Sequence, residues 1–101
     1  MSWLDIVEYG DFYDIPHCFV VEREDVLYIF DCPFDERLDD YGAEYEVLRL
    51  PDFARDLAAT HFTPWEHVLS LGDRVGSVLV AAVQFDGTRR RAIDERVFDL
   101  I

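Results

Sequence analysis

The sequence contains no lysine and no asparagine, and it has only two cysteines. All nine basic residues are arginines, whose planar guanidinium groups suit paired hydrogen bonds with carboxylates. Codon usage in a GC-rich genome explains the missing lysines more simply than a structural requirement does. Cys18 and Cys32 are too few for a disulfide framework, so we interpret them as free and mostly buried thiols.

Long hydrophobic runs are also absent. No run approaches the roughly 20 residues that span a bilayer. The N-terminal segment MSWLDIVEYGDFYD lacks the basic n-region and the small-residue cleavage site of a secretory signal peptide. We therefore expect a cytoplasmic protein that does not interact with membranes.

Positive charge is scarce, above all in the first half of the chain. The formal net charge is −13. Residues 1–50 contain fourteen acids and three arginines, a net charge of −11, whereas residues 51–101 contain eight acids and six arginines, a net charge of −2. Such a field repels nucleic acids and anionic membranes, and it favours a basic protein as partner.

The composition nevertheless predicts a packed fold. Half of the residues are hydrophobic and 15% are aromatic, which is more than a disordered acidic chain contains. A chain of 101 residues is long enough for a single domain, 1–101, with one modest core.

Alternating and β-branched segments predict strands in the first half. We expect them at Asp5–Tyr9, Cys18–Glu22, Val26–Asp31 and Glu44–Leu50, the last one ended by Pro51. The second and third strands are predicted to form an antiparallel hairpin. Its turn lacks the Asn-Gly or Asp-Gly pair that would fix the register.

The second half predicts shorter elements and a change of period. We expect a short helix at Asp52–Ala59, a strand at Trp65–Leu71, a turn at Gly72–Ser77 and an apolar strand at Ser77–Phe85. The i, i+4, i+7 spacing of hydrophobic residues then predicts a C-terminal helix over Thr88–Ile101. The fold class that follows is α+β and mainly antiparallel β, a small bent sheet or barrel of five to six strands with a C-terminal helix.

The segment FDCPFDERLDDY, residues 30–41, concentrates the acidic residues. Its carboxylates stand at positions 31, 35, 36, 39 and 40 with the nearest glycine at Gly42, a spacing that does not fit a calcium loop. General acid–base catalysis would require one buried carboxylate, whereas runs of like charge usually form solvated faces or partner surfaces. We therefore expect no metal and no cofactor. We predict that the acidic loop Asp31–Glu46, with its interspersed aromatic residues, forms a partner-binding surface whose main residues are Asp31, Asp35, Glu36, Asp39, Asp40, Tyr41 and Glu44.

The cysteine and histidine patterns do not define a site. In HCFVVER, four residues separate Cys18 from Arg23, one fewer than in the phosphatase loop motif, and Cys32 and Arg37 have the same spacing. No C-x-x-C or H-x-x-x-H spacing indicates zinc. A Cys/His nucleophile would have to be assembled by the fold.

Three consecutive arginines, Arg89, Arg90 and Arg91, stand at the first turn of the predicted C-terminal helix. Helix N-termini prefer acidic residues, so the cluster indicates either an anion-binding site or internal counter-charges. Because the first half of the chain has a net charge of −11, we favour counter-charges, together with Arg37.

In size and charge alone, the chain is similar to small acidic cytoplasmic inhibitors such as bacterial immunity or antitoxin-like proteins. Those proteins present a carboxylate-rich face to a basic partner. The first hypothesis is therefore a non-catalytic protein-binding domain. The alternatives are a small hydrolase based on a buried carboxylate, His17 or Cys32, and a domain that associates with itself through edge strands and aromatic residues.

Overall fold

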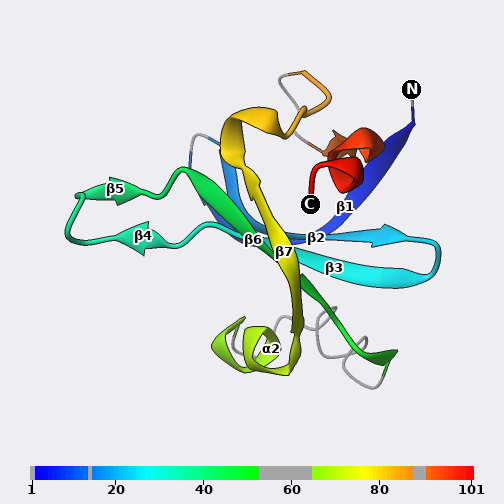
Figure 1. Ribbon diagram of the computed structural model, residues 1–101, viewed down its shortest axis with the longest axis horizontal. Coiled ribbons are helices and arrows are strands. Elements are labelled where there is room, and N and C mark those ends of the chain that lie inside the picture. The colour runs from blue at the N-terminus through cyan, green and yellow to red at the C-terminus, as the bar shows by residue number, and fades with distance from the viewer. Residues whose placement is uncertain (1, 14, 53–64, 88–90) are drawn as a thin grey trace.

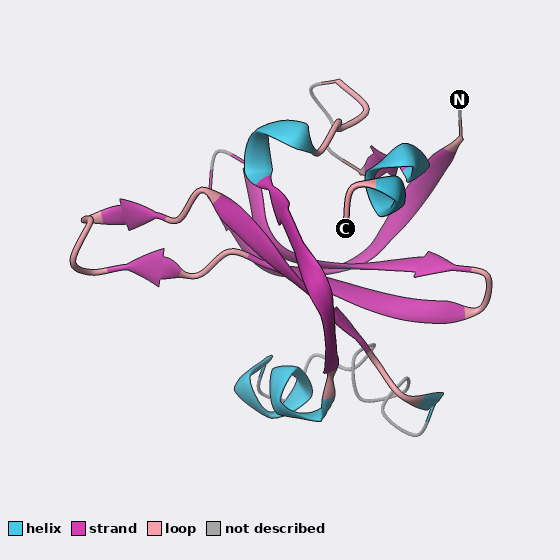
Figure 2. Ribbon diagram, viewed as in Figure 1, coloured by secondary structure: helices cyan, strands magenta, loops and turns pink. Residues whose placement is uncertain are grey.

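The computed structural model describes residues 2–13, 15–52, 65–87 and 91–101, and most of them form strands (Figures 1 and 2). The predicted helix at Asp52–Ala59 lies outside the described residues apart from Asp52. The described elements, in chain order, are β1 (Trp3–Tyr13), β2 (Ile15–Arg23), β3 (Val26–Asp31), β4 (Phe34–Asp35), β5 (Asp40–Tyr41), β6 (Glu44–Arg49), α2 (Trp65–Leu71), β7 (Asp73–Leu79), the 3-10 turn η2 (Val80–Ala82), β8 (Ala92–Asp94) and the 3-10 turn η3 (Glu95–Asp99).

The main sheet has six strands in the order β7-β6-β3-β2-β1-β8, and all of its pairings are antiparallel. The sheet curls into a half-barrel, while β4 and β5 form a separate two-stranded sheet that projects from it (Figure 1). The prediction of a mainly antiparallel, bent sheet is therefore confirmed. No helix among the described residues is long and apolar enough to cross a membrane.

The predicted hairpin between the second and third strands is confirmed, and its register is now fixed. β2 and β3 pair from Cys18 opposite Asp31 to Arg23 opposite Val26. Glu24 and Asp25 are left as a two-residue turn, with φ angles of 53° and 64°. Two successive positive φ values are typical of a type I′ turn, whose twist matches that of the strands. The turn thus forms without the glycine that usually marks it.

The inner face of the half-barrel holds the main core. Because side chains alternate along a strand, Phe19 of β2, Phe30 of β3 and Tyr45 of β6 all point inward, and none of them is exposed. Their rings pack on one another, and Ile93 of β8 and Val97 of η3 complete the cluster from the C-terminal segment. The last strand and turn therefore cover the concave side of the sheet.

The outer face of the sheet holds a second, smaller core. Val20, Leu27 and Ile29 form a second buried cluster there, and Leu69 and Leu71 of α2 pack against it. Figure 1 shows α2 below the sheet, at the end where β7 begins.

Two predictions for the segment after residue 64 are wrong. Trp65–Leu71 forms the helix α2 and not a strand. Leu69 and Leu71 of this helix pack against the outer cluster. Gly72–Ser77 was predicted to be a turn, but it lies mostly within β7. Its glycines serve close packing: a β-carbon at Gly72 would lie 2.9 Å from Leu48 Cβ.

The apolar strand predicted at Ser77–Phe85 is confirmed only in part, and the predicted C-terminal helix is not confirmed. β7 ends at Leu79, where η2 turns the chain, and Phe85 forms an isolated bridge with Ile93. Within the C-terminal segment, residues 92–94 form β8 and residues 95–99 form η3, so no α-helix is seen in the described part. The hydrophobic spacing correctly indicated that Ile93 and Val97 are buried. The two side chains reach the core from a strand and a 3-10 turn, however, and not from an α-helix.

A substitution at Gly76 of β7 tests whether Ile101 packs against this strand. A β-carbon at this position would lie 2.8 Å from Ile101 Cγ2, closer than real contacts allow. Gly76→Ala is expected to lower the free energy of unfolding by about 1–3 kcal/mol, the usual cost of overpacking. Urea unfolding measures the change, with Gly42→Ala as a control because nothing lies within 4 Å of its β-carbon. Equal stabilities of the two variants would contradict the contact.

Candidate functional site

The acidic segment predicted to bind a partner forms a projecting hairpin. We call residues 34–41, which comprise β4, the connecting turn and β5, the acidic arm. The arm leaves the sheet between β3 and β6 and points away from its body (Figure 1). It contains four carboxylates and one guanidinium, a formal net charge of −3. The structure therefore presents much of the predicted surface on one protruding element.

The tip of the arm is ordered by local hydrogen bonds. The carboxylate of Asp35 accepts a hydrogen bond from the backbone N–H of Arg37 at 2.9 Å, as in an Asx turn. The Arg37 guanidinium lies 3.7 Å from the same carboxylate and is almost fully exposed. Asp39 adopts a positive φ of 52°, which aspartate tolerates better than most residues. These contacts give the turn a defined shape without burying its charges.

Two hydrophobic side chains stand among the carboxylates of the arm. Phe34 is 49% exposed and Leu38 is 64% exposed. Single exposed hydrophobic residues are common on protein surfaces, so Phe34 and Leu38 support a binding surface only in combination with the carboxylates around them. Phe34 is one of the aromatic residues interspersed in the predicted acidic loop Asp31–Glu46, whereas Leu38 was not singled out from the sequence. Their position between acidic residues was the available signal.

The root of the arm is fastened to the half-barrel by aromatic stacking. The rings of Tyr41 and His17 are parallel, with centroids 3.4 Å apart, and Phe34 packs edge-on against Tyr41. His17 is buried and belongs to β2, so the stack joins the arm to the sheet. Beside it, the Cys32 thiol donates a hydrogen bond to the carbonyl of Gly42 at 3.1 Å. Both ends of the arm are therefore anchored.

Further carboxylates lie on the outer face of the sheet, next to the arm. Asp31 of β3 stands opposite Glu46 of β6. Glu44 precedes Glu46 by two residues in β6, so its side chain lies on the same face. Arg74 of β7 lies 3.0 Å from Glu46. Glu46 is the last residue of the predicted acidic loop Asp31–Glu46, and its alternation with Tyr45 and Val47 indicated an outward side chain. Together with the arm, Asp31, Glu44 and Glu46 form what we call the acidic surface.

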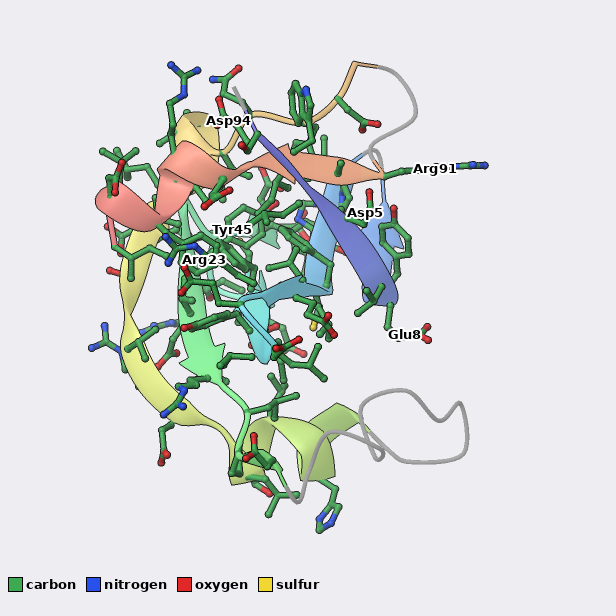
Figure 3. All side chains as sticks on the ribbon, turned by 90° about the vertical axis from the view of Figure 1, so that its right-hand side faces the viewer. Asp5, Glu8, Arg23, Tyr45, Arg91 and Asp94 are labelled. Atoms are coloured by element: carbon green, nitrogen blue, oxygen red, sulfur yellow. The ribbon has the colours of Figure 1, made fainter. Side chains whose placement is uncertain are left out.

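The predicted arginine cluster lies partly outside the described residues. Arg89 and Arg90 are not described, and Arg91 is placed beside β1, where its carbonyl accepts the N–H of Ile6. Its side chain points outward near Asp5 (Figure 3), well apart from the arm. The carboxylate of Asp86 instead accepts the backbone N–H of Arg91 at 2.7 Å. The structure thus brings Arg37, and not Arg91, to the acidic surface.

A second charged cluster surrounds η3 and is mainly structural. The buried Asp94 caps η3 by accepting the backbone N–H of Arg96, and the Arg96 guanidinium donates two more bonds to it. These bonds hold the pKa of the Asp94 carboxyl below its ordinary value. Arg23 adds a 3.5 Å ion pair with Glu95 and stacks over Phe98. The cluster fastens η3 over the inner core.

Two shallow hollows of about 320 and 300 Å³ flank Arg96. One is lined mainly by apolar atoms beside η2 and Gln84. The other is lined by Ser2, Arg23 and Glu95 besides Arg96. Acidic and basic groups alternate in the second hollow, so neither sign of ligand charge is favoured there.

The geometry around Cys32 does not favour nucleophilic catalysis. The thiol is 1% exposed. Burial, and then the charge of Asp31, raises the pKa of Cys32 above its ordinary value, so the unreactive protonated form predominates. Cys18 belongs to the outer cluster and Cys32 to the inner one. Among the described residues, no group of three or more His, Cys, Asp or Glu side chains converges as metal ligands would.

Thiol reactivity provides a prediction for these cysteines. In the native protein at pH 8, both Cys18 and Cys32 are expected to react with Ellman's reagent more than about 100-fold more slowly than free cysteine. After unfolding in guanidinium chloride, both should react at once. A native thiol that reacts as fast as free cysteine would show that one of the two sites is open to solvent and activated.

Comparison with protein-family models, curated proteins and solved structures found no match to this chain. Within the described residues, the acidic surface is the feature that combines exposed charge, exposed hydrophobic side chains and a fixed shape.

Proposed function

We propose that this protein is a non-catalytic binding domain whose acidic surface recognises a basic protein. The observation behind the proposal is the acidic arm, a projecting hairpin on which exposed carboxylates surround exposed Phe34 and Leu38. The arm contains one cation, Arg37, and that cation already lies beside Asp35. The remaining carboxylates of the arm are available to a cationic partner.

The two kinds of side chain have different parts in the proposed complex. Phe34 and Leu38 supply apolar area that a partner buries, and such area contributes about 25 cal/mol per Å². The carboxylates attract the partner at long range and reject acidic proteins, which determines the association rate and the specificity. A small hydrophobic anchor within a charged rim is typical of protein–protein interfaces.

The stacked root of the arm favours recognition by a largely preformed surface. Because Tyr41 stacks on the buried His17, the arm has a fixed base before any partner arrives. Ordering a loose hairpin on binding would cost conformational entropy for each residue ordered. A preformed arm avoids part of that cost and preserves affinity.

Salt-dependent capture tests the proposal. Immobilised protein is incubated with cell lysate at about 50 mM and about 500 mM salt, where the Debye length falls from roughly 14 to 4 Å. We expect a protein with a basic surface to be retained at low salt and lost at high salt. It is then purified and titrated. Failure to retain any basic protein at low salt would count strongly against the proposal.

The alternative functions have less support in the geometry. A hydrolase based on Cys32 would need an accessible thiolate, whereas this thiol is buried and its pKa is raised. Self-association remains a distinct alternative, because β7 lies at the end of the main sheet.

A further inference from the structure

The two ends of the main sheet differ in how they are covered. At one end, β8 bonds on its outer side to the segment after η2: the N–H of Asp94 donates to Gln84 at 2.9 Å, and the N–H of Asp86 donates to Ala92 at 3.1 Å. At the other end, β7 pairs with β6 and with no second strand in the described part of the chain. Among the described residues, the β7 edge is therefore the open edge of the half-barrel.

The alternation of hydrogen-bonded and non-hydrogen-bonded residue pairs between β6 and β7 shows which backbone groups of β7 face this edge. The N–H of Val80 donates to the carbonyl of Ala43 at 2.9 Å, which makes these two residues a hydrogen-bonded pair. In an antiparallel ladder such pairs alternate with non-bonded ones. Glu44 opposite Leu79 and Glu46 opposite Ser77 are thus non-bonded pairs. The N–H and C=O groups of Ser77 and Leu79 consequently point away from β6, toward an incoming strand.

The side chains along the β7 edge suit a cationic strand. Leu79 is 54% exposed and Val75 is 45% exposed, so both offer apolar contacts. Ser77 between them is small, and Glu46 stands directly behind it on β6. Glu46 is paired with Arg74 of β7 at 3.0 Å. Because strands lie about 4.8 Å apart, an arginine or lysine opposite Ser77 on an added strand can reach over the serine and share Glu46 with Arg74. Glu44, behind Leu79, extends the same row of negative charge.

We propose that the β7 edge binds an extended, basic segment of the partner by strand addition. The inference rests on the proposed function, because it specifies how the basic partner binds next to the acidic surface. Backbone hydrogen bonds to Ser77 and Leu79 would provide affinity, and alternate cationic side chains would provide specificity. A second copy of this chain fits the edge less well, since each copy has a net charge of −13 and presents the same row of glutamates.

Leu79 allows the edge to be blocked without disturbing the ladder. Its φ angle of −61° matches that of proline, and its N–H does not bond to β6. Leu79→Pro therefore removes one outward donor and places a ring in the path of an incoming strand. Leu79→Ala is the matched control, because it removes the exposed side chain but keeps the N–H. Circular dichroism and urea unfolding confirm that both variants are folded.

The probe is a fluorescent peptide of alternating arginine and valine, about ten residues long, titrated at about 50 mM salt. A peptide of alternating arginine and proline has the same charge but lacks every second backbone N–H and does not form strands. We expect the wild-type protein to bind the first peptide at least about tenfold more tightly than the second. Leu79→Pro should remove this preference, and Leu79→Ala should retain most of it.

The other outcomes separate this inference from the proposed function. Equal binding of both peptides, unchanged in Leu79→Pro, would overturn strand addition and leave charge recognition by the acidic surface intact. No binding of either peptide would contradict both proposals. A wild-type dimer in sedimentation that Leu79→Pro converts to a monomer would assign the edge to a second copy and overturn the basic segment as its occupant.

Discussion

Replacing Phe19 with alanine is expected to lower the free energy of unfolding by about 3–5 kcal/mol, the usual cost of truncating a buried phenylalanine. Phe19 is fully buried, and its ring packs against Phe30, Tyr45 and Phe85 with centroids 5.1, 5.4 and 5.8 Å away. The substitution leaves a cavity in the middle of the inner core that neighbouring rings cannot fill. Since domains are commonly stable by only about 5–15 kcal/mol, much of the total stability would be lost.

Phe34 provides the matched control, because it is the same residue type at 49% exposure on the acidic arm. Phe34→Ala is expected to change the free energy of unfolding by less than about 1 kcal/mol. Urea titration followed by circular dichroism compares the two variants at equal denaturant slope. Equal losses in both variants, or a negligible loss in Phe19→Ala, would show that the inner core is not organised around Phe19.

Neutralising the acidic arm is expected to weaken binding of the basic partner by about 100-fold, or about 2.7 kcal/mol. The estimate takes roughly 0.9 kcal/mol for each of the three carboxylates that Arg37 does not engage, within the range measured for exposed charge pairs. The salt dependence of the dissociation constant should also become shallower, because fewer charges attract the partner. The variant contains the substitutions Asp35→Asn, Glu36→Gln, Asp39→Asn and Asp40→Asn.

A control variant with the same net charge isolates the position of the charges. It contains Glu24→Gln, Asp25→Asn, Asp73→Asn and Asp99→Asn, all exposed positions outside the arm. We expect its affinity to fall less than about fivefold, through the change in overall charge alone. Similar losses in the two variants would mean that the partner senses net charge and that the arm has no special part in binding.

The first half of the fold was predictable because its strands are defined by local alternation. Cys18–Glu22 and Val26–Asp31 both lie within observed strands, and Glu44–Leu50 matches β6 to within one residue. Residues on these strands alternate between two environments, and a period of two records that directly. The register of the hairpin was not predictable, since Glu24 and Asp25 adopt positive φ angles without a glycine.

The second half was less predictable because its short segments are determined by long-range packing. Gly72 and Gly76 indicated a turn, but they are needed where Leu48 and Ile101 approach the backbone. No local pattern distinguishes a glycine in a turn from a glycine beneath a packed side chain. The helical spacing of Ile93 and Val97 was likewise compatible with another geometry that buries both residues.

The candidate site was predictable in composition but not in shape. The concentration of carboxylates in residues 31–46 was evident from the sequence, whereas their presentation on a projecting hairpin depends on the stack between His17 and Tyr41. These two residues are 24 positions apart, and nothing local pairs them. The open β7 edge follows from strand order, which the sequence does not specify.

The pairing of β1 with β8 determines when this domain finishes folding during synthesis. Trp3 pairs with Asp94 and Asp5 with Ala92, so the first strand receives its second partner only after residue 94 has left the ribosome. The β2–β3 hairpin, by contrast, joins residues that emerge together. Contacts of such long sequence separation slow folding. A nascent chain arrested before β8 therefore exposes one side of β1 and part of the inner core, the state in which chaperones and proteases act.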